Sequence, residues 1–107
     1  MNRSISPDDL KQLLYLRKNV LVLDVRRKND YQPDGQKIPG AAWLDPDKLA
    51  QWSTALPLDR DIVIYCARGG SVSNSVVDQL QAKGVKARYI EGGIEAWKNA
   101  GGELVDK

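Results

Sequence analysis

Histidine is absent from this chain of 107 residues, and cysteine occurs only once, at Cys66. Without histidine the protein cannot contain a Ser-His or Cys-His catalytic pair, so any nucleophile has to be activated by backbone groups and fixed charges. A lone cysteine forms no disulfide within the chain, and it builds no zinc site without other soft ligands. We therefore expect neither a bound metal nor a cofactor.

Long apolar runs are also missing. The longest, Val20–Leu23 and Ile62–Cys66, are far too short to cross a membrane, and the first residues lack the apolar segment of a signal peptide. We expect a cytoplasmic protein without membrane contacts. The formal net charge of +2 is too small to indicate a nucleic-acid partner, and the lack of a long apolar surface stretch favours a monomer.

The composition is that of a folded protein, with 42% hydrophobic and 28% charged residues. A chain of this length has room for one core, so we expect a single domain over residues 1–107. Short β-branched runs alternate with amphipathic segments, which predicts an α/β fold with a largely parallel sheet. The predicted strands, in order and with none after the fourth, are Val20–Val25, Ala41–Leu44, Ile62–Cys66 and Ala87–Ile90.

Four helices are predicted from capping residues, prolines and glycines. They run from Ser6-Pro7, from Asp45-Pro46 to Trp52, from Ser71 or Ser73 to Lys83-Gly84, and from Gly92-Gly93 to Gly101-Gly102. The apolar residues of the first and third recur at helical spacing: Leu10, Leu13 and Leu14 (with Arg17), then Val72, Val76, Val77 and Leu80. Residues 26–40 are polar and predict a loop with room for one helical turn.

The segment around Cys66 joins a buried strand to a helix. Ligands of open α/β sheets bind at the carboxyl ends of strands, where Cys66 stands, and the free N–H groups of the next helix point back at this loop. Gly69 and Gly70 permit positive φ and let amides converge on an anion. A thiolate is stabilised in such a place without a base, and Arg68 adds positive charge for an anionic substrate or leaving group.

A plainer interpretation of each feature exists. A lone cysteine after an apolar strand is more often a small buried residue, and two glycines alone indicate only a tight turn. The strand end, the glycines, Arg68 and the helix start occur together, however, and the combination favours a reactive thiol at Cys66.

Four short motifs occur in a fixed order along the chain: Asp24-Val25-Arg26, Ile38-Pro39-Gly40-Ala41, Cys66-Ala67-Arg68-Gly69-Gly70-Ser71, and Glu91-Gly92-Gly93 followed by Trp97. Together they resemble the single-domain rhodaneses, a family of thiosulfate sulfurtransferases, over nearly the whole length of the chain. The resemblance implies a three-layer α/β/α sandwich around a mostly parallel five-stranded sheet. It also implies that Cys66 carries a persulfide at the start of a six-residue active-site loop.

The resemblance implies a reaction and a set of roles. Cys66 would take a sulfane sulfur from thiosulfate or a related anionic donor and pass it to a thiol or cyanide. The substrate-binding residues would be the rest of the loop, namely Ala67, Arg68, Gly69, Gly70 and Ser71. Asp24 and Arg26 would hold the surrounding loops through charge-assisted hydrogen bonds rather than take part in the reaction.

Two positions depart from related patterns. Lys37 stands where the family often has a histidine, a position from which no general base is required. Related phosphatases have an arginine six positions after the cysteine, where this chain has Val72, so phosphoryl transfer is disfavoured. A persulfide carrier that docks to a partner protein of a sulfur relay, with little activity on thiosulfate, is the main alternative. A non-catalytic binding domain is another.

The remaining marked residues are expected to be structural. Arg27, Lys28 and Lys37 have the character of a solvated charged surface. The three tryptophans are predicted to pack in the core or at its edge: Trp43, Trp52 and Trp97.

Overall fold

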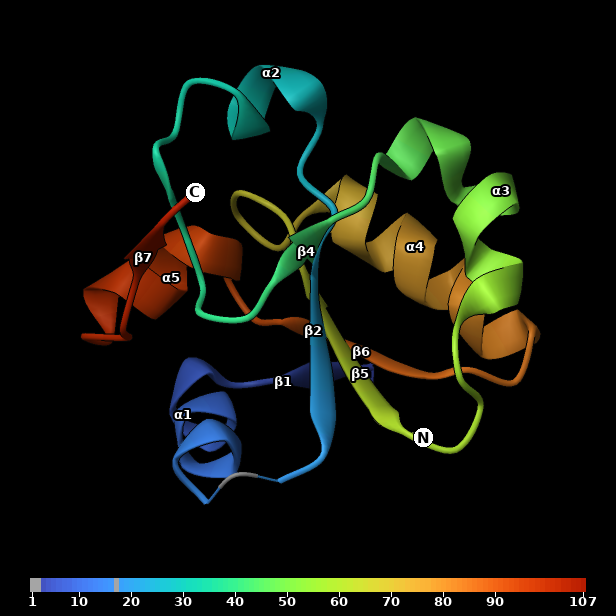
Figure 1. Ribbon diagram of the computed structural model, residues 1–107, viewed down its shortest axis with the longest axis horizontal. Helices are drawn as coiled ribbons and strands as arrows, with labels where there is room; N and C mark the ends of the chain where they lie inside the picture. The colour runs from blue at the N-terminus through green and yellow to red at the C-terminus, as the bar shows by residue number, and fades with distance from the viewer. Residues whose placement is uncertain (1–2, 17) are drawn as a thin grey trace.

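The computed structural model describes residues 3–16 and 18–107, so Arg17, which was expected on the inner face of the first helix, lies outside the described residues. Five strands form one sheet in the order β1-β6-β5-β2-β4, and every neighbouring pair is parallel (Figure 1). Their bounds are β1 Ser4–Ile5, β2 Val20–Asp24, β4 Ala42–Trp43, β5 Asp61–Tyr65 and β6 Lys86–Ile90.

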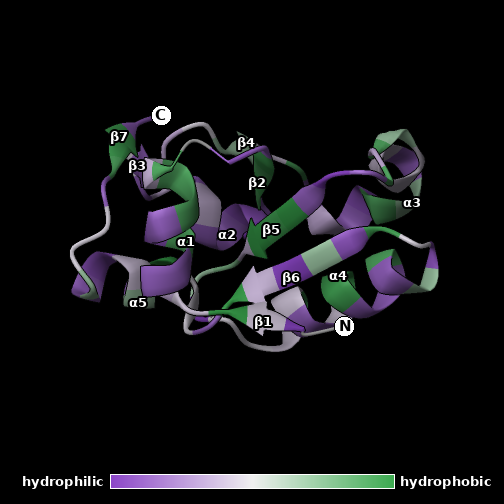
Figure 2. Ribbon diagram, turned by 90° about the horizontal axis from the view of Figure 1, so that it is seen from below, coloured by the Kyte–Doolittle hydropathy of each residue, from purple (hydrophilic) through white to green (hydrophobic). Residues whose placement is uncertain are grey.

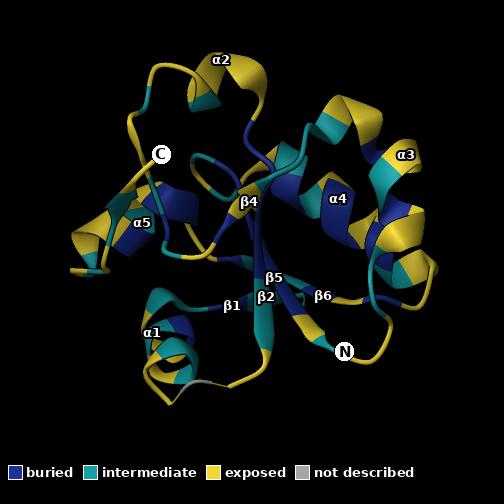
Figure 3. Cartoon of the chain, in the orientation of Figure 1, coloured by how far each residue is buried: buried dark blue, intermediate teal, exposed yellow. Residues whose placement is uncertain are grey.

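The two central strands are buried on both faces. In β2, Val22 belongs to one apolar cluster and Leu23 to the other, and in β5 the same alternation separates Val63 from Ile62 and Ile64. Successive side chains of a strand point to opposite faces, so a continuous apolar run predicts a strand covered on both sides. Figure 3 shows β2 and β5 as the most continuously buried strands.

Helices cover both faces of the sheet. Residues of α1 (Pro7–Tyr15) and α5 (Gly93–Asn99) pack into one apolar cluster, whereas α3 (Leu49–Trp52) and α4 (Ser71–Ala82) pack into the other. Figure 1 shows the first pair to the left of β2 and the second pair to its right. The predicted α/β/α sandwich with a parallel five-stranded sheet is therefore confirmed.

The helices form for the local reasons that their capping residues indicate. The Ser6 hydroxyl accepts a hydrogen bond from the Asp9 N–H at 3.1 Å, and Pro7 occupies the first turn of α1. Figure 2 shows hydrophobic and hydrophilic residues side by side on α1 and α4, as expected for helices with one face in the core. Among the described residues, no helix is long and apolar enough to span a membrane.

The predicted helix from Asp45 to Trp52 is shorter and broken. Asp45 does cap it, by accepting from the Asp47 N–H at 2.9 Å, but the first turn is a 3-10 helix over Pro46–Lys48. Lys48 then leaves helical geometry with φ −111° and ψ 24°, and α3 begins only at Leu49. A second 3-10 turn, Ser53–Ala55, follows α3.

Residues 26–40 contain the expected single helical turn, α2 (Lys28–Tyr31), and one strand that was not predicted. This strand, β3 (Gln36–Lys37), pairs antiparallel with β7 (Val105–Asp106) in a small separate sheet. The prediction that no strand follows Ala87–Ile90 was therefore wrong. Two-residue strands show no periodicity in the sequence, because their pairing depends on partners far along the chain.

Candidate active-site loop

Cys66 stands directly after β5, at the carboxyl edge of the sheet. Its strand lies between β6 and β2, and the register places Tyr65 beside Asp24 of β2. Cys66 is 6% exposed, so the sulfur lies at the base of the loop that follows and not on its rim.

The backbone of the loop turns toward the sulfur. Gly69 has φ +69°, and its N–H donates a hydrogen bond to Cys66 Sγ at 3.1 Å. A hydrogen bond from an amide favours the charged form of its acceptor, so this contact stabilises a thiolate. Gly70 has φ −91° and is the N-terminal residue that precedes α4. Positive φ, expected to be useful at both glycines, therefore occurs only at Gly69.

The loop lies between the N-terminal ends of two helices. The 12-residue helix α4 begins at Ser71, immediately after the loop. The first turn of α5 donates to the loop from its other side: the Ile94 N–H reaches the Cys66 carbonyl at 3.0 Å, and the Glu95 N–H reaches the Ala67 carbonyl at 3.1 Å. Backbone groups of α5 thus hold the two residues that start the loop.

Glycines allow this contact between backbones. A Cβ atom at Gly93 would lie 2.5 Å from the Cys66 carbonyl oxygen and 2.7 Å from the Ala67 carbonyl carbon. A Cβ atom at Gly69 would lie 2.7 Å from the Gly92 nitrogen. The glycine pair after β6 was expected only to turn the chain, but Gly93 also supports the loop. Two consecutive glycines after a strand that neighbours β5 are the signal that points to this role.

The outer part of the loop is exposed. Arg68, Gly70 and Ser71 face solvent, whereas Ala67 is half-buried. The Arg68 side chain is 84% exposed, and its Nε lies 3.1 Å from Glu95 Oε2, which belongs to a side chain 60% exposed. Arg68 therefore carries a charge at the rim of the loop, but that charge has a partner.

Asp24 and Arg26 form a buried ion pair beside the loop. Both side chains are 1% exposed, and Arg26 Nη2 lies 2.8 Å from Asp24 Oδ2, while Nε contacts both carboxylate oxygens at 3.1 Å. Arg26 also reaches Asp34 Oδ2 at 2.8 Å and the Gln36 carbonyl at 3.2 Å. The guanidinium thereby connects the end of β2 to the segment that carries β3.

The electrostatics of this cluster favour its charged state. Burial lowers the pKa of Arg26, but hydrogen bonding and attraction to Asp24 outweigh it and raise that pKa above its ordinary value. Burial also raises the pKa of Asp34, and hydrogen bonds from Gln36, Lys98 and Arg26 reverse this, so the net pKa lies below the ordinary value. Burial, with the Asp24 charge nearby, raises the pKa of Tyr65 well above its usual range, so its phenol stays protonated.

The other marked residues lie outside the loop. Lys37 Nζ donates to the Ala41 carbonyl at 3.0 Å, and Arg27 and Lys28 are exposed. Trp97 is 1% exposed in the core, as expected. Trp43 is half-buried and stacks on Tyr31, with ring centroids 4.5 Å apart.

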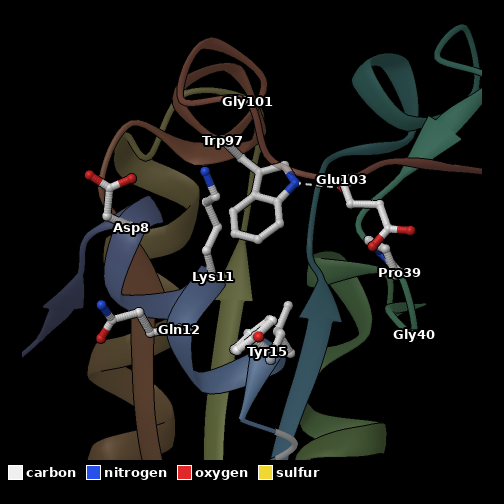
Figure 4. A pocket seen from close by; sticks show the side chains of 10 residues that line it. Asp8, Lys11, Gln12, Tyr15, Pro39, Gly40, Trp97, Gly101 and Glu103 are labelled. Carbon is white, nitrogen blue, oxygen red and sulfur yellow. Dashed lines mark hydrogen bonds between the residues drawn. The ribbon is translucent and has the colours of Figure 1, made fainter.

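A groove with a volume of about 1010 Å³ lies between α1 and the C-terminal end of α5 (Figure 4). Its lining includes Lys11, Tyr15, Pro39 and Glu103, and none of its residues belongs to the loop 66–71. Within the described residues, no group of three or more histidine, cysteine, aspartate or glutamate side chains is placed to hold a metal ion.

Comparison with known proteins agrees with this geometry. Residues 6–100 match the family described as "Rhodanese-like domain". A "Sulfurtransferase" of Allochromatium vinosum is 31% identical over 110 residues, covering 98% of this chain and 96% of the relative. The "Thiosulfate sulfurtransferase GlpE" of Coxiella burnetii is 31% identical over 86 residues, covering 79% of this chain and 78% of that protein.

The solved structures agree as well. A rhodanese-like domain protein from Staphylococcus aureus superposes with a TM-score of 0.82 at 33% identity, covering 98% of both chains. The chain belongs to the rhodanese-like domain family, and its curated relatives are sulfurtransferases.

Proposed function

We propose that this protein is a sulfurtransferase in which Cys66 carries the transferred sulfur as a persulfide. The observation that carries the proposal is the hydrogen bond from the Gly69 N–H to Cys66 Sγ, in a loop bounded by the N-terminal ends of α4 and α5. This arrangement stabilises negative charge on sulfur by backbone groups, which is what a chain without histidine requires.

The first half of the reaction loads the sulfur. The Cys66 thiolate attacks the outer sulfur of thiosulfate, a new S–S bond forms, and the original S–S bond breaks with its electron pair leaving on sulfite. In the second half, cyanide or a thiolate attacks the outer sulfur of the persulfide, and thiocyanate or a new persulfide leaves while the Cys66 thiolate returns. Charge and sulfur balance in each step, and the sequence of two displacements predicts ping-pong kinetics.

The loop supplies binding as well as activation. The backbone of Ala67, Gly69, Gly70 and Ser71 surrounds the place where a sulfur on Cys66 would extend, and Arg68 provides positive charge for an anionic donor. Because the chain has no second cysteine, the acceptor has to come from outside it. Action in the cytoplasm, as a monomer and as one domain over residues 1–107, stays a prediction from the sequence.

One observation favours the alternative of a persulfide carrier that docks to a partner protein. The charge of Arg68 is paired with Glu95 at 3.1 Å, which weakens the attraction of the loop for a small dianion such as thiosulfate. A protein donor that presents an uncharged persulfide would be affected less. Phosphoryl transfer remains disfavoured, because Val72 occupies the position of the phosphate-binding arginine.

Mass spectrometry of the intact protein tests the proposal. The protein is exposed briefly to thiosulfate and then to cyanide, and Cys66→Ser is treated in parallel. We expect the wild type to gain the mass of one sulfur atom and to lose it to cyanide, while the variant gains nothing. If the wild type gains no sulfur from thiosulfate but does from a protein persulfide, the carrier function replaces the proposal. A gain in both proteins would remove Cys66 from its proposed role.

A further inference from the structure

Glu95 is the acidic side chain that reaches the candidate loop from another element. It lies in the first turn of α5, its N–H donates to the Ala67 carbonyl at 3.1 Å, and its Oε2 lies 3.1 Å from Arg68 Nε. One residue thus contacts two consecutive loop residues, once through its backbone and once through its charge. The backbone contact fixes where the carboxylate can reach, so the ion pair forms at the rim above Cys66.

We infer that Glu95 is a specificity-determining residue, which limits the preference of the site for anionic sulfur donors by neutralising Arg68. This inference rests on the proposed sulfur transfer through Cys66. With both charges present the rim has no net charge from this pair. Removal of Glu95 leaves one positive charge, and removal of Arg68 leaves one negative charge. The pair therefore sets the charge that an approaching donor meets.

The expected size of the effect follows from Coulomb's law. At a separation on the order of 8 Å in a water-like medium, one unit charge changes the rate of approach of a monoanion about twofold and of a dianion about fivefold. The Debye length is about 8 Å at physiological ionic strength, so the effect should shrink with added salt. Both side chains are largely exposed, which makes these values upper estimates.

A first experiment needs no sulfur transfer. Cys66 is alkylated with iodoacetate, an anion, and with iodoacetamide, its neutral analogue, and the ratio of the two rates reports the local charge. We expect Glu95→Gln to raise the ratio about twofold at low salt. Arg68→Gln should lower it, and the double variant, with the same net charge as the wild type, should restore it. Glu103→Gln, an exposed change beyond the far end of α5, should leave it unchanged.

A second experiment measures thiosulfate itself. For Glu95→Gln we expect KM for thiosulfate to fall about fivefold at low salt with kcat unchanged, and to approach the wild-type value at high salt. A merely structural role of Glu95 would change kcat or stability instead, without this salt dependence.

The outcomes separate the two claims. An alkylation ratio for Glu95→Gln equal to that of the wild type and of Glu103→Gln at low salt overturns the inference. If the ratio responds as expected but thiosulfate never loads Cys66, the charge control by Glu95 stands and the proposed use of thiosulfate fails.

Discussion

The substitution Gly93→Ala tests whether α5 holds the candidate loop in place. Gly93 has φ +64°, and a Cβ atom there would lie 2.5 Å from the Cys66 carbonyl oxygen and 2.7 Å from the Ala67 carbonyl carbon. A left-handed conformation costs a non-glycine residue about 1–2 kcal/mol. The close contacts are with backbone atoms, which cannot rotate away, so we expect a total loss of about 2–4 kcal/mol in the free energy of unfolding.

A second glycine separates backbone strain from the clash. Gly84 has a similar φ of +84°, but a Cβ atom there would meet nothing within 4 Å. Gly84→Ala should therefore lose only the conformational term of about 1–2 kcal/mol. Urea denaturation followed by circular dichroism measures both losses, and thermal melting should show a decrease of about 4–8 °C for each kcal/mol.

The loop itself provides the second readout of this comparison. In folded Gly93→Ala the carbonyls of Cys66 and Ala67 have to shift, so we expect sulfur loading on Cys66 to slow about tenfold or more. Gly84→Ala should load at the wild-type rate. Equal stability losses in the two variants, together with an unchanged loading rate in Gly93→Ala, would refute the view that Gly93 supports the loop.

Three further predictions concern the buried polar groups. Arg26→Met leaves Asp24 buried without its partner and should cost about 3–5 kcal/mol in a urea titration, whereas Lys98→Met, which removes a partly exposed pair, should cost less than about 1 kcal/mol. Burial raises the pKa of Asp34, but its hydrogen bonds bring the net pKa below 3.8, so its ionised form stabilises the fold above the unfolded pKa and this contribution is lost as the pH falls through the folded value. Asp34→Asn should therefore be less stable than the wild type at pH 7, with a difference that disappears in acid; a constant difference would contradict this. Ser73 is fully buried with no hydrogen-bond partner for its hydroxyl among the described residues, so Ser73→Ala should unfold at equal or higher urea, by about 1 kcal/mol.

The central strands could be predicted because their signal is local. Val20–Asp24 and Asp61–Tyr65 are apolar over nearly every residue, and this pattern needs no knowledge of the partner strand. The strands β1, β3 and β7 have two residues each and were not predicted. They exist because other segments offer them backbone partners, as Ser4 pairs with Tyr89 of β6. Such a pairing leaves no trace in a short stretch of sequence.

The candidate site divides in the same way. The loop from Cys66 to Ser71 is contiguous, so its glycines and its place between a strand and a helix could be recognised in the sequence. The contacts of Gly93 and Glu95 come from a segment some 27 residues beyond Cys66, and only the order of strands β5 and β6 brings that segment to the loop. The sequence marked both glycines but could not indicate which backbone they approach.

These contacts connect the reactivity of Cys66 to the stability of its surroundings. A catalytic histidine could stay useful when a neighbouring backbone moves, because its side chain carries the base. Here the stabilising groups are peptide N–H groups, whose positions are set by the loop and by the two carbonyl contacts from α5. Local opening of the first turn of α5 would release the carbonyls of Cys66 and Ala67 and with them the position of the Gly69 N–H. The residues that matter most for the chemistry are therefore those at which a side chain does not fit, Gly69 and Gly93, rather than any ionisable group near the sulfur.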